Sequence, residues 1–272
     1  MFSKIKDTYH HFFLKNSFEE GIRYFEARKL TDCPSLSDYI YNRLFLTRLY
    51  IYSGRFNFAR KIFEELREKI PIPKDILVEE FANTIDLEIS YYEGKYDDCE
   101  ELLKNNSEFF EIDRLVVDAK VNWKKGSIYE AISGYFRALL KFSIDDNIES
   151  YYEGRILNLL GLCFVSLKNY SMGEKILKIA LEKTKSSLSP NHCYIGLCEA
   201  DLARCLLKSE QNELDAKSYL EKSEQKLELK DNKTGRFEAI MLKNRARLSW
   251  RNEKYEEAVN LYREELKIRK EI

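Results

Sequence analysis

Few residues of this 272-residue chain have side chains suited to metal binding. There are three histidines, and two of them, His10 and His11, are adjacent, so on a helix they point to different sides and make a poor metal pair. Structural zinc sites normally use closely spaced pairs such as C-x₂₋₄-C. The best metal candidate is the looser group formed by His192, Cys193, Cys198 and Cys205. We expect these cysteines to be buried structural thiols and predict no metal and no cofactor.

Catalytic motifs are equally scarce. The chain contains no G-x-G-x-x-G, no P-loop and no G-x-S-x-G sequence. Its carboxylate pairs are adjacent along the chain, which is typical of a solvated helix surface rather than of two carboxylates that face each other across a site. A triad would need a serine or cysteine beside His192 in space, an arrangement that the sequence leaves open. We therefore predict that the protein is not an enzyme and has no catalytic residues.

The overall charge gives no support for nucleic-acid binding. The formal net charge is −1 and the isoelectric point is near 6.4, whereas a nucleic-acid binder usually carries a basic excess. A local basic run keeps that alternative open: Arg236, Lys243, Arg245, Arg247 and Arg251. No stretch approaches the roughly 20 apolar residues of a membrane helix, and the first residues lack a signal-peptide core. With six scattered cysteines, the chain suits a reducing compartment, so we expect a cytoplasmic protein.

The organisation of the chain is more informative than its chemistry. A short polar turn, an aromatic residue and then a small residue recur along the chain, most clearly from Gly54 to Ala59. The small residues are separated by 38, 40, 32, 42, 43 and 42 positions. They are Gly21, Ala59, Cys99, Ala131, Gly173, Ala216 and Ala258. Recurrence at this interval is the signature of a helical repeat array.

Each repeat predicts a pair of helices. Apolar residues at helical spacing lie on both sides of Gly54, where the chain must reverse and a positive φ is often needed. Ala59 is small because the two helices cross closely there. Neither helix buries its face alone, so each hairpin needs a neighbour, and we expect contacts between nearest neighbours only. We predict an all-α fold: a right-handed superhelical solenoid of about seven helix-turn-helix hairpins, forming one domain over residues 1–272.

The order of the motif resembles the tetratricopeptide repeat (TPR). That family places a large residue, then Leu-Gly, Tyr, Gly-x-Tyr-x-x-Ala, Phe, Ala and Pro over about 34 residues. The first copy reads Leu46, Tyr50, Gly54, Phe56, Ala59, Phe63 and Pro71, and the fifth reads Leu157, Leu160, Gly161, Phe164, Tyr170, Gly173, Leu177 and Ala180. Most units are longer than the family average. In the units containing Asp86, Asp118 and Arg245 the first-helix register shifts by one residue.

Long, degenerate, tyrosine-rich repeats of this interval look most like the TPR domains of bacterial quorum-sensing peptide receptors. These include the Rap-type response-regulator inhibitors and related peptide-controlled transcription factors such as the phage arbitrium receptors. The resemblance implies a bacterial or phage protein that binds a peptide. The first hairpin begins almost at Met1, so we expect no N-terminal helix-turn-helix domain and no Rap-type N-terminal bundle.

The first helix of each pair usually lines the concave side of such a solenoid, and its exposed face is where we expect a ligand. Asparagine donates to and accepts from an extended peptide at once, arginine pairs with carboxylates through two hydrogen bonds, and tyrosine supplies contact area at low entropic cost. The candidate peptide-binding residues are Tyr41, Arg48, Tyr52, Glu88, Tyr92, Lys120, Arg155, Asn158, Asp201, Arg204, Asn244, Arg247 and Arg251.

Our leading hypothesis is a non-catalytic, regulatory TPR-like module that binds a short peptide or a segment of a partner protein in its concave groove. Two alternatives come from other classes. One is an oligomeric structural or regulatory subunit, since the last hairpin ends without an obvious polar capping helix. The other is nucleic-acid binding through the basic run that begins at Arg236. We expect no membrane partner, and the chain allows a homo-oligomer.

Overall fold

The computed structural model describes residues 2–69, 75–104, 109–144, 150–209, 212–227 and 235–271. Pro71, which closes the first copy of the motif, lies outside these residues. The described part of the chain forms fourteen α-helices and no strands, which confirms the all-α prediction. The helices are α1 (Phe2–Leu14), α2 (Phe18–Glu26), α3 (Leu36–Tyr52), α4 (Phe56–Lys69), α5 (Ile76–Tyr92), α6 (Tyr96–Leu103), α7 (Glu111–Lys125), α8 (Ile128–Ile144), α9 (Tyr151–Ser166), α10 (Tyr170–Ser187), α11 (Cys193–Ser209), α12 (Glu213–Leu227), α13 (Gly235–Arg251) and α14 (Tyr255–Glu271).

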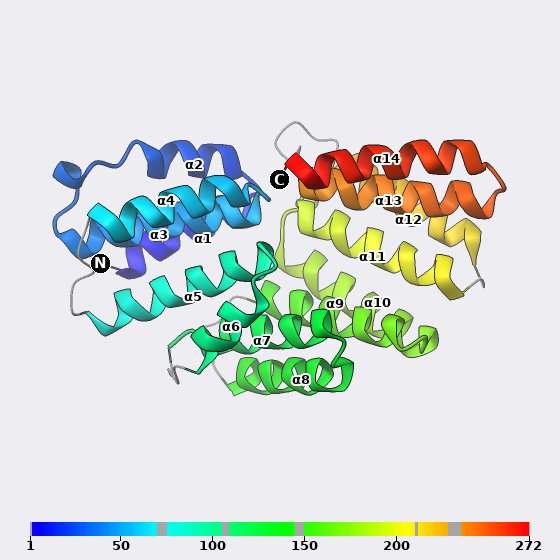
Figure 1. Ribbon diagram of the computed structural model, residues 1–272, viewed down its shortest axis with the longest axis horizontal. Helices are drawn as coiled ribbons and strands as arrows, with labels where there is room; N and C mark the ends of the chain where they lie inside the picture. The colour runs from blue at the N-terminus through cyan, green and yellow to red at the C-terminus, as the bar shows by residue number, and fades with distance from the viewer. Residues whose placement is uncertain are drawn as a thin grey trace.

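Seven antiparallel hairpins, from α1–α2 to α13–α14, follow one another around an arch (Figure 1). The first helices pack on one another along the inside, α3 on α5, α5 on α7, and α9 and α13 on α11. Thirteen of the 17 residues of α3 are buried, against two of 17 in α14. The first helices are therefore the inner layer of an all-α solenoid, and the second helices cover them from outside.

The hairpin turns share one backbone device. A residue with positive φ stands five positions before the small residue in six of the described turns: Asn16, Gly54, Gly94, Gly126, Lys168 and Glu253. In each turn the next amide reaches back to a carbonyl five residues earlier, as in the bond from the Arg55 N–H to the Tyr50 carbonyl at 2.8 Å. This left-handed cap satisfies the last carbonyls of the first helix and reverses the chain.

The small residues sit where the two helices of a hairpin touch, and all seven are buried. A Cβ atom at Gly173 would lie 2.8 Å from a methyl carbon of Val165 and 3.3 Å from the Gly161 carbonyl oxygen. The helices α9 and α10 therefore approach too closely there for a larger side chain. This confirms the reason given for the recurrence of small residues.

The expectation of nearest-neighbour contacts only is wrong, because the coil closes on itself. The first hairpin touches the start of α11: the ring nitrogen Nε2 of His192 lies 2.8 Å from the carbonyl oxygen of Phe13. The backbone amide of Cys193 donates to the side-chain oxygen of Asn16 at 3.3 Å, and the rings of Phe13 and Tyr194 are 5.7 Å apart. Residues about 180 positions apart thus share one core.

None of the described helices combines the length and apolarity needed to cross a membrane. All six cysteines fall within the described residues and are free thiols, five of them buried.

Closure through His192 predicts how stability depends on pH. Nδ1 of His192 accepts from the Tyr194 amide at 3.1 Å, so Nε2 carries the proton that Phe13 receives. Burial, opposed only by the bond to Phe13, lowers the pKa of His192 to about 4. Since the unfolded pKa is about 6.5, the unfolded state binds the extra proton between these values. The contribution of His192 to stability is full above pH 6.5 and falls as the pH drops toward 4, by about 1.4 kcal/mol per pH unit. His10, whose pKa burial also lowers to about 4, adds to this dependence.

Replacing His192 with glutamine keeps a donor for Phe13 but removes the titrating ring. The free energy of unfolding in urea, measured at pH 4.5 and 6.5, should therefore change less in His192→Gln than in the parent protein, by about 1.4 kcal/mol per pH unit. His11→Gln is the control, because His11 is exposed on α1. An unchanged pH dependence in His192→Gln would contradict this account.

Candidate functional site

The predicted site residues lie on the inner helices, but they do not form an open face. None of the thirteen is exposed. Neighbouring inner helices pack against most of them, and Tyr52, Tyr92 and Arg155 also contact helices across the coil. The expectation of an exposed groove surface is therefore wrong. The buried members are Tyr41, Arg48, Tyr52, Glu88, Lys120, Asn158, Asp201 and Asn244, and the half-buried members are Tyr92, Arg155, Arg204, Arg247 and Arg251.

In the N-terminal half the inner charges neutralise one another. The buried guanidinium of Arg48 donates to Glu88 at 3.1 Å and forms a second ion pair with Asp113. Asp113 also accepts from the hydroxyl of Tyr152 at 3.1 Å, and the ring of Tyr52 lies under the guanidinium. This network ties α3, α5, α7 and α9 together.

Tyr41 lies apart from the rest of the predicted set. Its ring is 6.5 Å from that of Phe81. Burial, with the nearby charges of Asp75 and Asp38, raises the pKa of its hydroxyl to about 12. It lines no part of the pocket described next, so the structure does not bring it together with the other candidates.

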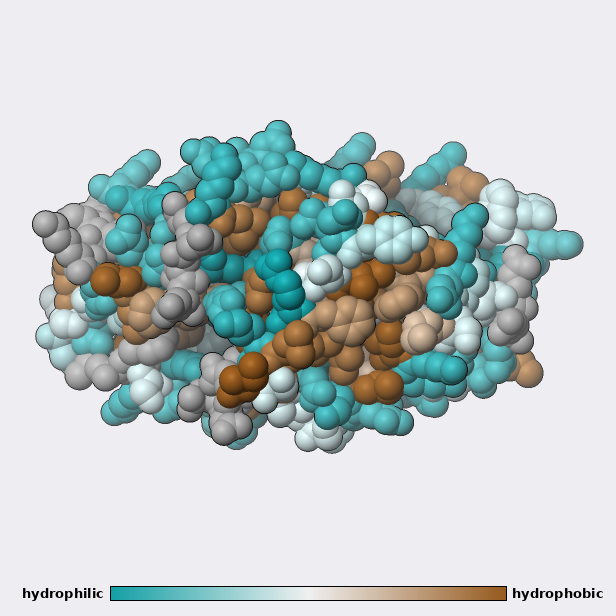
Figure 2. Space-filling model, turned by 90° about the horizontal axis from the view of Figure 1, so that it is seen from below, coloured by the Kyte–Doolittle hydropathy of each residue, from teal (hydrophilic) through white to brown (hydrophobic). Residues whose placement is uncertain are grey.

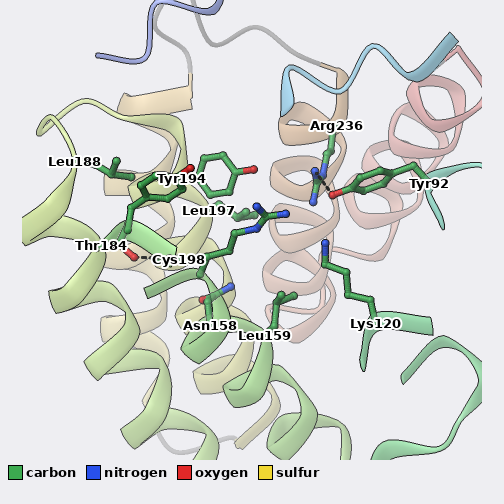
Figure 3. A pocket seen from close by; sticks show the side chains of 12 residues that line it. Tyr92, Lys120, Asn158, Leu159, Thr184, Leu188, Tyr194, Leu197, Cys198 and Arg236 are labelled. Atoms are coloured by element: carbon green, nitrogen blue, oxygen red, sulfur yellow. Dashed lines mark hydrogen bonds between the residues drawn. The ribbon is translucent and has the colours of Figure 1, made fainter. Parts of the chain in front are cut away.

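A pocket opens in the middle of the inner surface (Figure 3). Three cations from different hairpins line it: Lys120 of α7, Arg155 of α9 and Arg236 of α13. Figure 3 shows the Lys120 amine and the Arg236 guanidinium pointing toward the hydroxyl of Tyr92. The described residues that line the pocket are Tyr92, Lys120, Tyr151, Arg155, Asn158, Leu159, Thr184, Leu188, Tyr194, Leu197, Cys198 and Arg236.

The partners of these cations are aromatic side chains of other inner helices. Arg155 donates to the Tyr52 hydroxyl at 2.9 Å, and Arg236 donates to the Tyr92 hydroxyl at 3.1 Å. The Lys120 amine lies 5.5 Å from the centre of the Tyr92 ring. The two arginine contacts join α9 and α13 to α3 and α5, so they also hold the coil closed, whereas Lys120 and Tyr92 lie on the neighbouring helices α7 and α5.

The burial and the excess positive charge of the pocket shift the pKa values of Lys120 and Tyr92. Burial lowers the pKa of Lys120 to about 8, with Tyr92 opposing the shift and Arg155 adding to it. Burial alone would raise the pKa of Tyr92, but the charges of Arg236, Lys120 and Arg155 outweigh it and lower that pKa to about 7. A negative charge is therefore strongly favoured at this point of the molecule.

Two buried polar atoms of the pocket lack a hydrogen-bond partner within the described residues. The side-chain nitrogen of Asn158 donates to Asp201 at 2.8 Å, which leaves its oxygen Oδ1 unpaired. The hydroxyl of Tyr151 is the second unpaired group. These residues are 5% and 3% exposed, so bulk water does not readily satisfy either atom. Unpaired buried polar atoms are costly and mark a place where a ligand or ordered water binds.

The C-terminal part of the inner surface is also cationic. Arg204 reaches Asp201 at 3.4 Å, and Arg247 donates to Asn244 at 3.0 Å. Asn244 and Arg251 donate to the backbone carbonyls of Ala200 and Leu207, at 3.1 and 2.6 Å. Burial, together with Arg247 and Arg204, lowers the pKa of Lys208. This side of the channel therefore holds more positive than negative charge.

The four residues considered for a metal do not converge. His192 and Cys193 lie beside Phe13 and Asn16, whereas Cys198 contacts the Thr184 hydroxyl at 3.6 Å and Cys205 faces the Tyr170 carbonyl at 3.5 Å. Within the described ranges, no three His, Cys, Asp or Glu side chains are placed to hold a metal ion.

Two larger hollows, of about 430 and 410 Å³, flank the short helix α6 on the outside of the arch. Both are lined by side chains of either sign, and some of these already form ion pairs, such as Arg60 with Asp86 at 2.9 Å. The lining of the first has as many cations as carboxylates and that of the second has one more carboxylate than cations, so neither has the excess positive charge of the pocket around Arg155. Asp86 and Arg245, in the units with a shifted register, pair with outer helices: Arg60 of α4 and Glu224 of α12.

Four of the predicted residues line the pocket: Tyr92, Lys120, Arg155 and Asn158. Sequence reasoning did not assign Arg236 and Tyr194 to it. Arg236 precedes Arg247 by eleven positions and Tyr194 precedes Asp201 by seven, so each lies on the same helix face as a residue that was selected. Extending those faces toward the helix N-termini would have found both.

Comparison with known proteins shows which solved structures share this fold. No protein-family model and no curated protein matches the chain by sequence. A Rap protein solved in complex with Competence and Sporulation Factor superposes with a TM-score of 0.63 at 15% identity; the match covers 86% of this chain and 66% of that one, slightly less than two thirds. The apo form of RapI gives 0.56 at 15%, with coverage of 85% and 97%. BtubC (BKLC) from P. vanneervenii gives 0.51 at 14%, with coverage of 77% and 88%.

These likenesses confirm the predicted TPR-like solenoid and its resemblance to the fold of Rap proteins. At this level of identity the shared property is the fold.

The Arg48 network predicts a large effect on stability. Arg48→Met leaves the carboxylates of Glu88 and Asp113 buried without their cation. Loss of one partner from a buried ion pair costs about 3–5 kcal/mol, so the urea midpoint of unfolding should fall sharply. Arg55→Met is the matched control, because its ion pair with Glu19 is partly exposed and such pairs contribute about 0–1 kcal/mol. An equal fall of the urea midpoint in the two variants would show that the Arg48 network does not stabilise the fold more than a surface ion pair does.

Proposed function

We propose that this protein is a non-catalytic TPR-like interaction module that binds a short peptide, or an extended segment of a partner protein, on the inner surface of its coil. The observation that carries the proposal is the central pocket. Five inner helices, α5, α7, α9, α11 and α13, contribute side chains to it, and two buried polar atoms in it lack a partner within the described residues. A site built from so many repeats is typical of recognition by a solenoid.

The chemistry of the pocket favours binding over catalysis. Its polar groups are one amine, two guanidinium groups, three phenols, an amide, the Thr184 hydroxyl and the Cys198 thiol. The hydroxyl donates to the Ala180 carbonyl, and burial raises the pKa of the thiol, so neither is an activated nucleophile.

His192 donates to the Phe13 carbonyl and accepts from the Tyr194 amide, and the Cys193 thiol lies 3.8 Å from its Nδ1. Burial raises the pKa of the Cys193 thiol, which disfavours the thiolate that a cysteine nucleophile needs. These contacts argue against the triad that the sequence left open.

The cross-channel contacts support a regulatory role. A ligand that pairs with Arg155 or Arg236 competes with the hydroxyls of Tyr52 and Tyr92, which hold the two sides of the coil together. Binding would therefore change the curvature of the solenoid, as expected of a peptide sensor or of a protein that sequesters a partner. The likeness to a Rap protein in complex with Competence and Sporulation Factor is consistent with such a role by analogy. Free buried thiols suit a cytoplasmic location.

The basic run does not favour nucleic acid. Arg236 points into the pocket, Arg245 pairs with Glu224 on the outer side, and Arg251 donates to the Leu207 carbonyl. These guanidinium groups thus face different directions and form no continuous basic surface along which a phosphate backbone could lie.

Affinity selection tests the proposed function. The full chain is incubated with a pool of synthetic five- to eight-residue peptides, retained peptides are identified by mass spectrometry, and their affinities are measured by isothermal titration. We expect micromolar or tighter binding that weakens at least tenfold in Asn158→Ala and in Arg247→Ala. Lys175→Ala, at an exposed position of the outer helix α10, should bind as the parent does. Retention of no peptide, or full affinity in both inner-surface variants, would contradict the proposal.

A second candidate function is assembly with another protein, including a second copy of the chain. Figure 2 shows apolar side chains gathered in a stripe on the side of the molecule where α8 lies. Tyr129, Phe136, Leu140 and Ile144 of α8 are exposed and fall on one helix face. Contiguous exposed apolar surface of this kind marks interaction sites.

Light scattering coupled to size exclusion tests this candidate. If α8 mediates self-association, the parent protein should show a mass above 32.3 kDa that rises with concentration. Leu140→Glu should restore the monomer, because it places a charge in the apolar stripe, while Lys175→Glu should not. A monomeric parent at every concentration would rule out self-association through α8.

A further inference from the structure

The apolar stripe on α8 has the spacing of a surface that packs on another helix. α8 lies at the outer edge of the arch (Figure 1), and it packs on α7 and α9 through a buried face that includes Ala131, Tyr135 and Ala138. Four residues of the opposite face are exposed at intervals of four, three and four positions: Tyr129, Ser133, Phe136 and Leu140. This alternation of three and four is the spacing of the contact line between two helices that lie side by side.

The two sides of this contact line differ in chemistry. On one side Ile132 and Leu139, both half-buried, continue the apolar surface. On the other side Glu130 and Arg137 are exposed and carry opposite charges. Charged residues that border such a contact line determine which helix pairs with it and in which direction.

A second copy of α8 that runs antiparallel to the first fits the contact line. When the two-fold axis passes level with Gly134, Phe136 of each copy lies over Ser133 of the other. Tyr129 of each copy then packs against Leu140 of the other. Each large aromatic side chain thus meets a smaller one, and the same contacts occur twice, as a two-fold interface requires.

The two borders are complementary in the same register. Ile132 lies beside Leu139 of the other copy, and Glu130 lies beside Arg137 of the other copy, so apolar meets apolar and negative meets positive. A parallel pair would instead place Phe136 against Phe136 and Ser133 against Ser133. That arrangement crowds one layer and leaves a gap in the next, which close packing disfavours.

The exposed area is sufficient for a weak dimer. Tyr129, Phe136 and Leu140 expose 73%, 48% and 64% of their surface. At about 200 Å² for each side chain, two copies bury roughly 700 Å² of apolar surface. The stems of Glu130 and Arg137 bring the interface to the lower limit of about 1,000 Å² for specific association. We therefore expect a dissociation constant in the micromolar rather than the nanomolar range.

We propose that the protein forms a symmetric dimer in which α8 of one copy packs antiparallel on α8 of the other. The inference rests on the second candidate function and deepens it, because it names the partner as a second copy and fixes the orientation of the two chains. Since α8 belongs to the outer layer and the central pocket to the inner one, the dimer carries two pockets and can engage a partner with two binding segments.

Disulfide cross-linking tests the orientation. The full chain carries Cys33→Ser to remove the one native thiol that is not buried. Tyr129→Cys and Leu140→Cys are prepared separately, with tags of different size, and are oxidised alone and mixed. We expect cross-linked heterodimer in the mixture and at least tenfold less cross-linked product from either variant alone. In the antiparallel dimer the two copies of one position lie about 16 Å apart along the helices, whereas a disulfide needs Cα atoms within about 7 Å.

Charge reversal is an independent test of the same register. Glu130→Arg and Arg137→Glu should each raise the dissociation constant of the dimer at least tenfold, because like charges then meet at two symmetric contacts. The double variant should return to within threefold of the parent value. Lys175→Glu, at an exposed position of α10, is the control and should dimerise as the parent does. Sedimentation equilibrium measures the constants, and circular dichroism should show equal helix content in every variant.

The outcomes separate this inference from the functions proposed above. Efficient cross-linking of Tyr129→Cys with itself overturns the antiparallel arrangement but leaves self-association in place. A double charge variant as weak as the single ones overturns the pairing of Glu130 with Arg137 and hence the register. A parent protein that stays monomeric at every concentration overturns the dimer altogether, and peptide binding, measured separately, then decides the inner-surface function.

Discussion

The structure depends on one constraint: the solenoid curls until its inner helices meet. Contact between the first hairpin and α11, through Phe13 and His192, closes the coil and leaves the inner surface only partly accessible to water. Every charged or polar side chain on that surface must then find a partner on another hairpin or remain unpaired at a cost. The inner surface is consequently a set of cross-channel contacts with one pocket between them, and not an open groove.

This constraint has different consequences in the two halves of the molecule. In the N-terminal half, Arg48 meets both Glu88 and Asp113, so the charges cancel and the helices pack tightly. Toward the C-terminal half the cations outnumber the carboxylates, and phenols take the place of counter-ions around Arg155 and Arg236. A phenol satisfies a guanidinium less well than a carboxylate does. The arginines of the pocket therefore have phenol partners but no carboxylate among the described residues that line it.

The hairpins could be predicted from the sequence because their determinants are local. A left-handed residue, an aromatic residue and a small residue within six positions are enough to specify a turn and a close crossing, as at Gly54 and Ala59. The residues on the inner face of each helix can then be identified from their helical spacing. Closure could not be predicted, because it depends on the sum of the packing angles of successive hairpins. The exposed groove was therefore the wrong expectation, and the place of Arg236 opposite Tyr92 went unrecognised.

The most direct measurement of the central claim is a spectrophotometric titration of tyrosine at 295 nm. The uncompensated cations of the pocket hold the pKa of Tyr92 at about 7, whereas burial raises the pKa of its neighbour Tyr91. The account predicts that one phenolate forms with a midpoint near pH 7 in the parent protein and that this step is missing in Tyr92→Phe. A protein in which no tyrosine ionises below pH 9 would show that the pocket holds no excess positive charge.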